Sequence, residues 1–476
     1  MSEVKYIKKD KEGLEEIKVG KEDSIKCPVF IPEIKSSEDL YPLLNHRNFL
    51  ENKNPIMVPG YKWQKIRTKE EFTDRKDEIK KLMKDHPLLY YEPPELFRYK
   101  RPSNLITYSL RGSRAKRRDF NKEIKNKNID DAIEILPEFF QPFVECQLNR
   151  VLEIMEDKYD ESLEEEKLER WDKPIAQAWT DERVNKGWQE YFFTLAKDAS
   201  KMPNANLIPP SPPLLKSSKL INKENRVLAD LKRIRGVNRA MMNITEKVGG
   251  ELSSYFHLYI DYGIFKPNSN VSLRKLQEKI EKEIQVNSYA GIALTISNYS
   301  KVWKNDLVKR LGNFITSIVN IAKENYLPVI LPRSKWYGEY LTDYGVNGFS
   351  SLMNGHYRYS QRSTGGIGEK ARYGKVPVIE LANEYNIEKI QRFLKEYGEL
   401  PNIESLPSKP EWNPDGGSLT EKFGNPKQFR IHFGKARRLS HVEEASRLRE
   451  SIKDGNLSPA KRYLEKSDHP ELSNKN

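Results

Sequence analysis

The sequence has few cysteines and no long apolar run. Only two cysteines, Cys27 and Cys146, occur among 476 residues, so they cannot build a disulfide framework or a four-cysteine zinc site. No apolar stretch approaches the roughly 20 residues that a membrane-spanning helix needs. The first residues, MSEVKYIKKDKEG, lack the apolar core of a secretory signal. These absences predict a protein of a reducing compartment, expected in the cytoplasm and not bound to a membrane.

Several phosphate-binding and metal-binding motifs are also missing. The sequence contains no G-x-G-x-x-G after an expected strand, no G-x-x-x-x-G-K-[ST] loop and no G-x-S-x-G turn. Dinucleotide-binding, NTPase and α/β-hydrolase classes are therefore disfavoured. The seven histidines are scattered and form no H-E-x-x-H pair. We accordingly expect no metal site and no cofactor.

Positive charge, by contrast, is abundant and clustered. The chain has a net charge of +13, and aromatic residues, at 10%, argue against general disorder. Residues 101–128 carry nine Lys or Arg against two acids, and residues 427–462 carry ten against four, which accounts for the whole excess. A clustered excess predicts a polyanionic partner, because each neutralised phosphate releases counterions. We expect nucleic acid, either tRNA or DNA; the alternative is a solvated basic face. The sequence does not identify a protein partner, and it leaves a homo-oligomer open.

Short apolar runs alternate with helical stretches along the chain. Continuous apolar runs of this kind are typical of strands buried on both faces of a parallel sheet. Residues 307–324 show the one-sided apolar spacing of a packed helix. The alternation predicts an α/β fold, either a TIM-type (β/α)8-like barrel or a doubly wound sheet, and we favour the barrel, with two of the strands below as extras. The ten expected strands are residues 28–34, 55–60, 87–91, 104–110, 206–209, 256–260, 291–297, 328–331, 348–352 and 376–381.

Composition divides the chain into parts. A helical insertion with an acidic run separates the two parts of the barrel, and a Pro/Gly/Asn-rich linker precedes a basic helix. The expected segments are residues 1–130 and 203–400 for the barrel, 131–202 for the helical insertion, 401–430 for the linker, 431–464 for the basic C-terminal helical segment and 465–476 for a flexible tail.

Polar residues follow several of the expected strands. In parallel α/β barrels the active site is built from loops at the carboxyl ends of the strands. Glu92 and Asp261 each follow a strand, and a carboxylate there can act as a base or a nucleophile. The structural alternative is that Asp261 caps the turn in D-Y-G and that Glu92 is an exposed loop acid. Arg333 follows another strand and is a candidate for nucleic-acid binding.

Two basic loops are the main candidates for nucleic-acid contact. Residues 354–374 interleave cations with tyrosines and contain five glycines, which suits a phosphate backbone and an unstacked base. The segment RGSRAKRR follows an expected strand and is either a phosphate clamp or only a basic loop. The candidates are Arg111, Arg114, Lys116, Arg117 and Arg118 in that segment, His356, Arg358 and Arg362 in the Gly-rich loop, and Arg437 and Arg438 on the C-terminal helix.

Three segments also match parts of one family. The opening GLEEIKVGKEDSIKCPVFIPEI resembles a lead-in followed by a "PVFMP" strand, and GVNGFSS at residues 345–351 resembles a last-strand "GVDMFDC". Residues 431–455 resemble a final helix of the form "HN…LMREIREAI..G". Together they make the chain similar to the tRNA-guanine transglycosylases, barrel enzymes that exchange a guanine base in tRNA, with relatives that act on DNA. The resemblance implies a nucleic-acid partner and a pentosyltransferase that exchanges or recognises a guanine-type base.

The chain departs from this family at the catalytic positions. The family's nucleophilic aspartate falls on Ser350, and its second catalytic aspartate, in a "DSGG" motif, falls near Glu92 without the glycines. Two cysteines cannot supply the family's three zinc-binding cysteines. Because a serine nucleophile needs its own base, either Asp261 or Asp343 has taken the role, or the chemistry is lost. Two alternatives stay open: a non-catalytic nucleic-acid-binding or scaffold barrel, and an unrelated barrel enzyme for a small anionic substrate.

Overall fold

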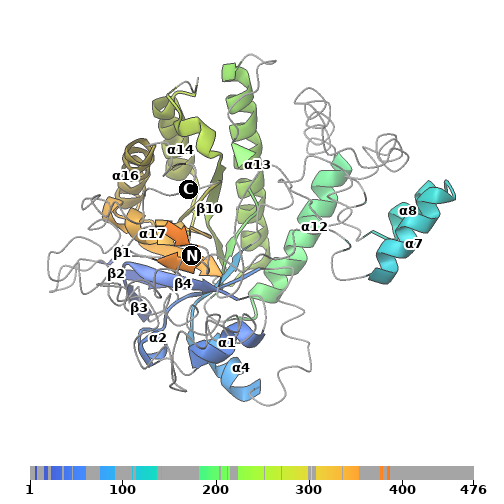
Figure 1. The fold of residues 1–476 in the computed structure, drawn as a ribbon, viewed down its shortest axis with the longest axis horizontal. Coiled ribbons are helices and arrows are strands. Elements are labelled where there is room, and N and C mark those ends of the chain that lie inside the picture. Colours follow the sequence, from blue (N-terminus) through green and yellow to red (C-terminus); the bar gives the residue numbers. More distant parts are fainter. Residues whose placement is uncertain are drawn as a thin grey trace, which may run out of the picture.

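A computed structural model gives the fold of the chain (Figure 1). Helices surround a parallel sheet that curves into a barrel. The structure describes residues 6–7, 16–19, 23–34, 37–44, 47–59, 76–91, 110, 114–136, 141, 182–202, 205–211, 213–214, 223–250, 252–267, 269, 271–297, 302, 307–334, 336–352, 376–378 and 383–385.

The central sheet has ten strands, and every neighbouring pair is parallel. Its order is β8-β10-β11-β12-β13-β4-β5-β6-β7-β9. The strands are β4 (Val29–Glu33), β5 (Ile56–Pro59), β6 (Leu88–Tyr91), β7 (Ala205–Ile208), β8 (Pro213–Leu214), β9 (Ser253–Ser254), β10 (Phe256–Ile260), β11 (Ile292–Ile296), β12 (Val329–Leu331) and β13 (Gly348–Leu352).

The two edges of this sheet meet. The edge strand β8 follows β7 along the chain, and the edge strand β9 directly precedes β10. The stretch from β7 to β8 therefore lies beside the stretch from β9 to β10, and backbone hydrogen bonds join them. Tyr255 N donates to Leu207 O at 2.8 Å, and Asp261 N donates to Leu214 O at 3.0 Å. The sheet is therefore a nearly closed parallel barrel, which confirms the predicted α/β barrel-like class.

Eight of the ten predicted strands coincide with strands of this barrel. The strand predicted at residues 376–381 is β14 (Val376–Val378), which pairs antiparallel with β15 (Asn383–Tyr385) in a separate sheet. The strand predicted at 104–110 lies outside the described residues except for Leu110, which is in a turn. An antiparallel sheet of β1 (Tyr6–Ile7), β2 (Glu16–Val19) and β3 (Asp23–Lys26) precedes the barrel and was not predicted.

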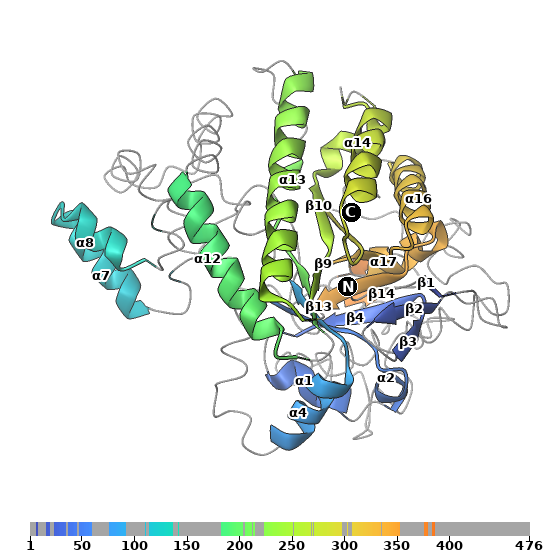
Figure 2. The same cartoon turned by 180° about the vertical axis from the view of Figure 1, so that it is seen from behind.

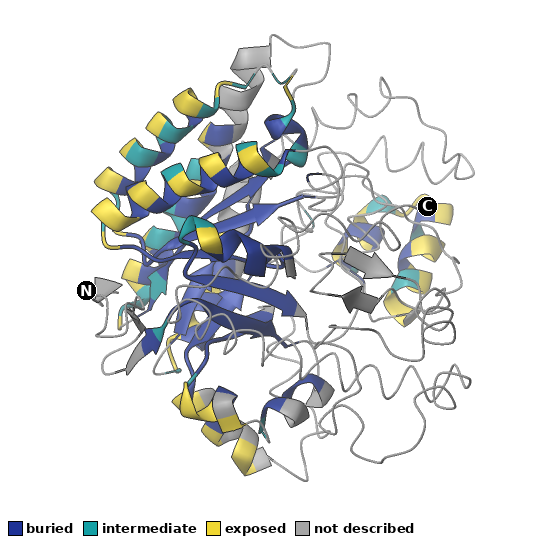
Figure 3. Cartoon of the chain, turned by 60° about the vertical axis from the view of Figure 1, so that its left-hand side comes forward, coloured by how far each residue is buried: buried dark blue, intermediate teal, exposed yellow. Residues whose placement is uncertain are grey.

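Helices cover the outside of the barrel, with buried inner faces and exposed outer faces (Figure 3). The helix predicted at residues 307–324 is α16, where Leu311, Ile315 and Ile318 are buried. Among the residues described, no helix has both the length and the apolar character to cross a membrane. The covering helices are α1 (Ser37–Leu44), α2 (Arg47–Glu51), α4 (Lys76–Asp85), α13 (Lys223–Val248), α14 (Leu273–Val286), α16 (Val308–Glu324) and α17 (Trp336–Leu341), with short 3-10 turns η3 (Tyr262–Phe265) and η4 (Thr342–Tyr344).

The strands separate two hydrophobic cores. Successive side chains of a strand point to opposite faces, so Phe30 belongs to the large cluster with the helices, while Val29 and Ile31 belong to a smaller cluster enclosed by the strands. The smaller cluster also contains the buried side chain of Cys27. A packed interior of this kind leaves the strand ends as the place for polar groups.

The helices between β6 and β7 lie to one side of the barrel. They are α7 (Arg114–Lys125), α8 (Ile129–Glu134) and α12 (Glu182–Ala199), so α7 begins ahead of residue 131, the predicted start of the insertion. Figures 1 and 2 show α12 beside α13, and α7 with α8 farther out, apart from the barrel. These two outer helices share a small core that includes Phe120, Ile124 and Ile133.

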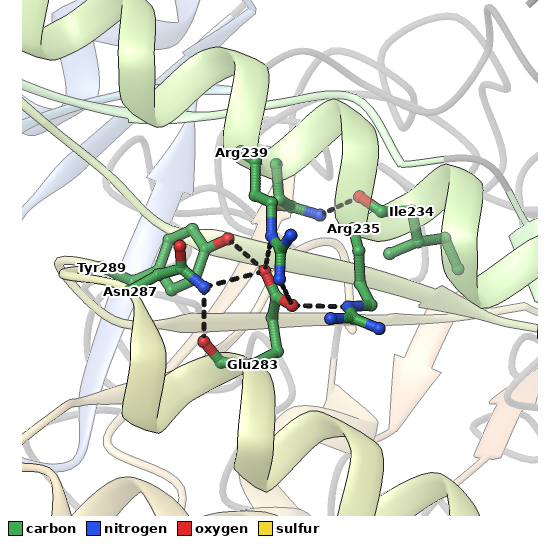
Figure 4. A network of polar contacts seen from close by, with 7 residues as sticks. Ile234, Arg235, Arg239, Glu283, Asn287 and Tyr289 are labelled. Carbon is green, nitrogen blue, oxygen red and sulfur yellow. Dashed lines mark hydrogen bonds and ion pairs between the residues drawn. The ribbon is translucent and has the colours of Figure 1, made fainter. Parts of the chain in front are cut away.

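A buried carboxylate joins α13 to α14 (Figure 4). Glu283 has no exposed surface, and it accepts hydrogen bonds from Arg235, from Arg239 Nε at 2.7 Å, from Asn287 at 3.0 Å and from Tyr289 at 3.1 Å. Burial acts to raise the pKa of Glu283, but the hydrogen bonds from Arg239 and Arg235 outweigh it, and the pKa is lowered. The ionised carboxylate therefore stabilises the contact between the two helices.

Replacement of this carboxylate is expected to weaken the fold. Glu283→Gln leaves two arginines without their anion and should lower the free energy of unfolding by about 2 kcal/mol, less than for a fully enclosed pair because both arginines are partly exposed. Because the pKa of Glu283 is lower in the folded chain, its contribution is present above its ordinary pKa and is lost as the pH falls through the folded pKa. Urea unfolding at neutral and acid pH should show that the difference in the free energy of unfolding between the variant and the unchanged chain shrinks in acid.

The control is Glu278→Gln, which breaks the exposed pair with Arg274 on the same helix and should cost less than about 0.5 kcal/mol. Equal losses in the two variants would contradict the role of Glu283.

Candidate functional site at the carboxyl end of the barrel

An ion pair is enclosed at the carboxyl ends of the strands. Glu33 ends β4, and Arg333 comes two residues after β12. Arg333 Nε and a terminal nitrogen donate to the two oxygens of Glu33, both at 2.6 Å, and both side chains are almost fully buried. The guanidinium carbon also lies 5.2 Å from the centre of the Tyr91 ring, at the end of β6. This two-pronged geometry fixes the loop after β12 against β4.

The backbone of Arg333 is held as firmly as its side chain. Its φ of +54° lies in the left-handed region, which costs a non-glycine residue on the order of 1 kcal/mol. The Arg333 N–H donates to Ser350 Oγ of β13 at 2.7 Å. The Ser350 hydroxyl in turn contacts Met57 Sδ at 3.5 Å. The strained loop is retained because contacts to three strands determine its position.

Asp261 lies at the carboxyl end of β10 with both carboxylate oxygens engaged. Oδ1 accepts a hydrogen bond from Gly263 N at 2.9 Å and caps η3, and Oδ2 accepts one from Ser297 Oγ at 2.7 Å. Ser297 follows β11 and accepts a hydrogen bond from Tyr262 N at 3.1 Å. The side chain of Asp261 is thus oriented by two neighbouring strand ends, and the residue keeps 8% of its surface exposed.

A buried histidine lies on β10, four residues before Asp261. His257 of β10 is fully buried. Its Nε2 lies 2.8 Å from Thr295 Oγ1 of β11, and its Nδ1 is hydrogen-bonded to the carbonyl of Pro209. Its ring meets the Tyr91 ring edge-on at 5.7 Å, so Tyr91 touches both His257 and Arg333. Burial lowers the pKa of His257 to about 4, against a smaller opposing effect of the Pro209 carbonyl. The imidazole is therefore neutral near pH 7, with Nδ1–H donating to Pro209 and Nε2 accepting from Thr295.

The neutral state of His257 predicts a loss of stability in mild acid. The unfolded chain takes up a proton near pH 6.5, whereas the folded chain resists protonation down to pH 4, so stability is complete above about pH 6.5 and falls toward pH 4. Between pH 7.5 and pH 5 this one group should remove about 2 kcal/mol from the free energy of unfolding. His257→Gln keeps a polar side chain that does not titrate. Urea unfolding at both pH values should show that the free energy of unfolding falls between pH 7.5 and pH 5 by about 2 kcal/mol less in the variant than in the unchanged chain. An equal fall in both proteins would contradict a buried, neutral imidazole.

The structure brings some of the predicted site residues together and leaves one apart. Asp261, Arg333 and Ser350 all lie at or near the carboxyl ends of barrel strands, and Asp261 also caps its turn, as the structural alternative held. The Arg333 guanidinium is turned inward to Glu33 rather than exposed. Asp343 is exposed in η4, ahead of β13, at the opposite end of the barrel from Asp261.

The other predicted residues fall elsewhere. Arg114 begins α7, and Lys116, Arg117 and Arg118 follow on the same helix, away from the barrel (Figure 2). Outside the described residues lie Glu92, Arg111, His356, Arg358, Arg362, Arg437 and Arg438.

Four further residues of this site were not found from the sequence. They are Glu33, Tyr91, His257 and Ser297. Glu33 ends the otherwise apolar run of β4, and a polar residue at an inward strand position is the one local signal that could have indicated it.

Neither the models of protein families nor the curated proteins contain a match to this sequence. Within the described ranges, no group of three or more His, Cys, Asp or Glu is placed to hold a metal ion.

Proposed function

We propose that this chain is a TIM-type barrel protein that exchanges or recognises a guanine-type base in tRNA or DNA, in the manner of the tRNA-guanine transglycosylases that it resembles. If β7 and β8 are counted as one strand, and β9 and β10 as another, the sheet has the eight parallel strands that a TIM-type barrel requires. The observation that carries the proposal is the placement of Asp261. Its carboxylate is oriented at the strand ends where barrel enzymes have their catalytic groups.

Asp261 is the nucleophile of the proposed exchange. An oxygen of its carboxylate forms a bond to the anomeric carbon of the sugar, and the bond from that carbon to the base nitrogen breaks. The departing base takes the bonding electron pair and a proton, for which Glu92 is the predicted donor. An incoming base then attacks the same carbon, displaces the carboxylate and returns a proton to the donor. The target nucleotide must be extruded from its stack to reach a carboxylate with so little exposed surface.

The hydrogen bonds of Ser350 and Asp261 favour a second function, in which the barrel binds nucleic acid without catalysis. Ser350, at the position of the family's nucleophile, has its hydroxyl engaged by Arg333 N and Met57. Both oxygens of Asp261 serve a turn cap and Ser297. A barrel that has kept its nucleic-acid surface and uses these groups only for folding would bind without turnover.

One experiment tests the proposal and separates the two functions. Purified protein is incubated with radiolabelled guanine and either pooled tRNA or duplex DNA, and binding of each nucleic acid is measured in parallel over a range of salt concentrations. Incorporation into either pool supports base exchange. Salt-dependent binding without incorporation supports the binding module, and absence of both contradicts a nucleic-acid partner.

A further inference from the structure

A row of cations lies along one face of α7. Within the described part of the chain, six residues line a hollow of about 720 Å³; five lie on this helix, and Asn126 directly follows it. Four of the six are cationic, and the other two have amide side chains that both donate and accept hydrogen bonds. We name this feature the α7 groove; its residues are Arg117, Arg118, Asn121, Lys122, Lys125 and Asn126.

The helix presents this face because its other face is already covered. Phe120 and Ile124 are buried in the small core shared with Ala132 and Ile133 of α8. Lys122, Lys125 and the asparagines of the groove are exposed. A helix that lies on a lipid surface needs its apolar face for the lipid, and here that face packs against protein. The groove is therefore suited to a water-exposed polyanion and not to a membrane.

Acidic neighbours neutralise little of this charge. Asp119 lies 3.8 Å from Arg118, but both side chains are mostly exposed, so the pair is weak. Glu123 accepts a hydrogen bond from Asn128, on the side of the helix toward α8. The acids of α8, Asp130 and Asp131, are in its own first turn, where they complement its helix dipole.

The spacing of the cations fits a linear chain of phosphates. Arg118 and Lys125 are seven residues apart, which is about 10.5 Å along a helix that rises 1.5 Å per residue. Along the axis of a duplex, one strand advances about 3.4 Å per phosphate, so this length corresponds to about three phosphate steps. A single bound phosphate would instead need cations that converge on one point. An extended polyanion matches a row that runs along the helix.

We propose that the α7 groove binds the phosphate backbone of the nucleic acid, at a place separate from the carboxyl end of the barrel. The inference rests on the nucleic-acid partner of the proposed function and adds a second, chemically inert contact, in which Lys122 and Lys125 join Arg117 and Arg118. The helices that carry the groove share their own core and stand apart from the barrel in Figures 1 and 2. The groove contributes affinity independent of sequence, while the barrel end selects the base.

The test compares two double substitutions in the full chain. Lys122→Ala with Lys125→Ala removes two cations of the groove, and Lys279→Ala with Lys282→Ala removes two lysines at the same spacing on α14. Binding of fluorescent pooled tRNA and of short duplex DNA is measured across salt concentrations. In the groove variant the slope of log affinity against log salt should fall by nearly 2 for the duplex, and affinity at low salt should drop about tenfold or more. The α14 variant should match the unchanged chain, and thermal unfolding should be the same in all three.

Each outcome has a distinct meaning. Equal slopes in the groove variant and the unchanged chain would overturn the groove while leaving the nucleic-acid partner intact. If the unchanged chain binds neither nucleic acid, the proposed function fails as well. Tighter binding of polyglutamate than of either nucleic acid, lost in the groove variant, would overturn the assignment in favour of an acidic protein.

Discussion

Asp261→Asn is expected to abolish base exchange and to leave nucleic-acid binding unchanged. The amide keeps the shape of the side chain: its oxygen can still accept from Gly263 N, and its NH₂ can donate to Ser297 Oγ. It cannot attack the anomeric carbon as a carboxylate does, so incorporation of labelled guanine should fall by at least about a thousandfold, as for other residues that act on the reacting atoms. Both guanine incorporation and the salt dependence of binding are measured on the same preparation.

Two matched variants make this result specific. Asp343→Asn is the same change at an exposed carboxylate at the opposite end of the barrel, and it should leave incorporation unchanged. Ser297→Ala removes one of the two hydrogen bonds that orient Asp261, so it should lower turnover about tenfold without eliminating it. If Asp261→Asn keeps full turnover, Asp261 is only the cap of η3. If Asp343→Asn loses turnover, the nucleophile is there instead.

The strands of the barrel could be predicted from the sequence because both of their faces are buried. β10 reads FHLYI and β11 reads IALTI, and in both every residue is buried, so the apolar run itself marks the strand. The N-terminal sheet lacks this signal. Its strands β2 and β3 read EIKV and DSIK, in which charged residues alternate with a few apolar ones. Short strands of this composition depend on their pairing partner more than on their own sequence.

The contacts of the site could not be predicted in the same way. Asp261 was found because it directly follows an apolar run, and its turn-capping role was visible in the local sequence D-Y-G. Glu33 and Arg333 are 300 residues apart, and only closure of the barrel brings them together. His257 lies inside a strand; its neutral state follows from its burial, and its two ring partners, the Pro209 carbonyl and Thr295, are both distant from it in sequence. Local patterns predict elements, whereas partners across a closed sheet follow from topology.

Of the polar contacts at the carboxyl end of the barrel, the ion pair between Glu33 and Arg333 is expected to contribute most to the free energy of unfolding. Glu33→Gln would replace the carboxylate that accepts two hydrogen bonds from a guanidinium with 1% of its side chain exposed, and should lower the free energy of unfolding by about 3–5 kcal/mol. The cost is mainly that of weakening the compensation of a buried charge. Arg333→Met should cost a similar amount, because it leaves the fully buried Glu33 carboxylate without the guanidinium that it pairs with.

A double-mutant cycle distinguishes this pair from an incidental contact. Because Glu33→Gln with Arg333→Met removes both charges, it should be clearly less destabilised than the sum of the single changes. The control is Glu51→Gln, which breaks the exposed pair with Arg47 on α2 and should cost less than about 0.5 kcal/mol. Urea unfolding of all four variants gives the coupling free energy. Simple additivity would mean that the two side chains stabilise the barrel end separately, and that their pairing does not hold the strained loop after β12 in place.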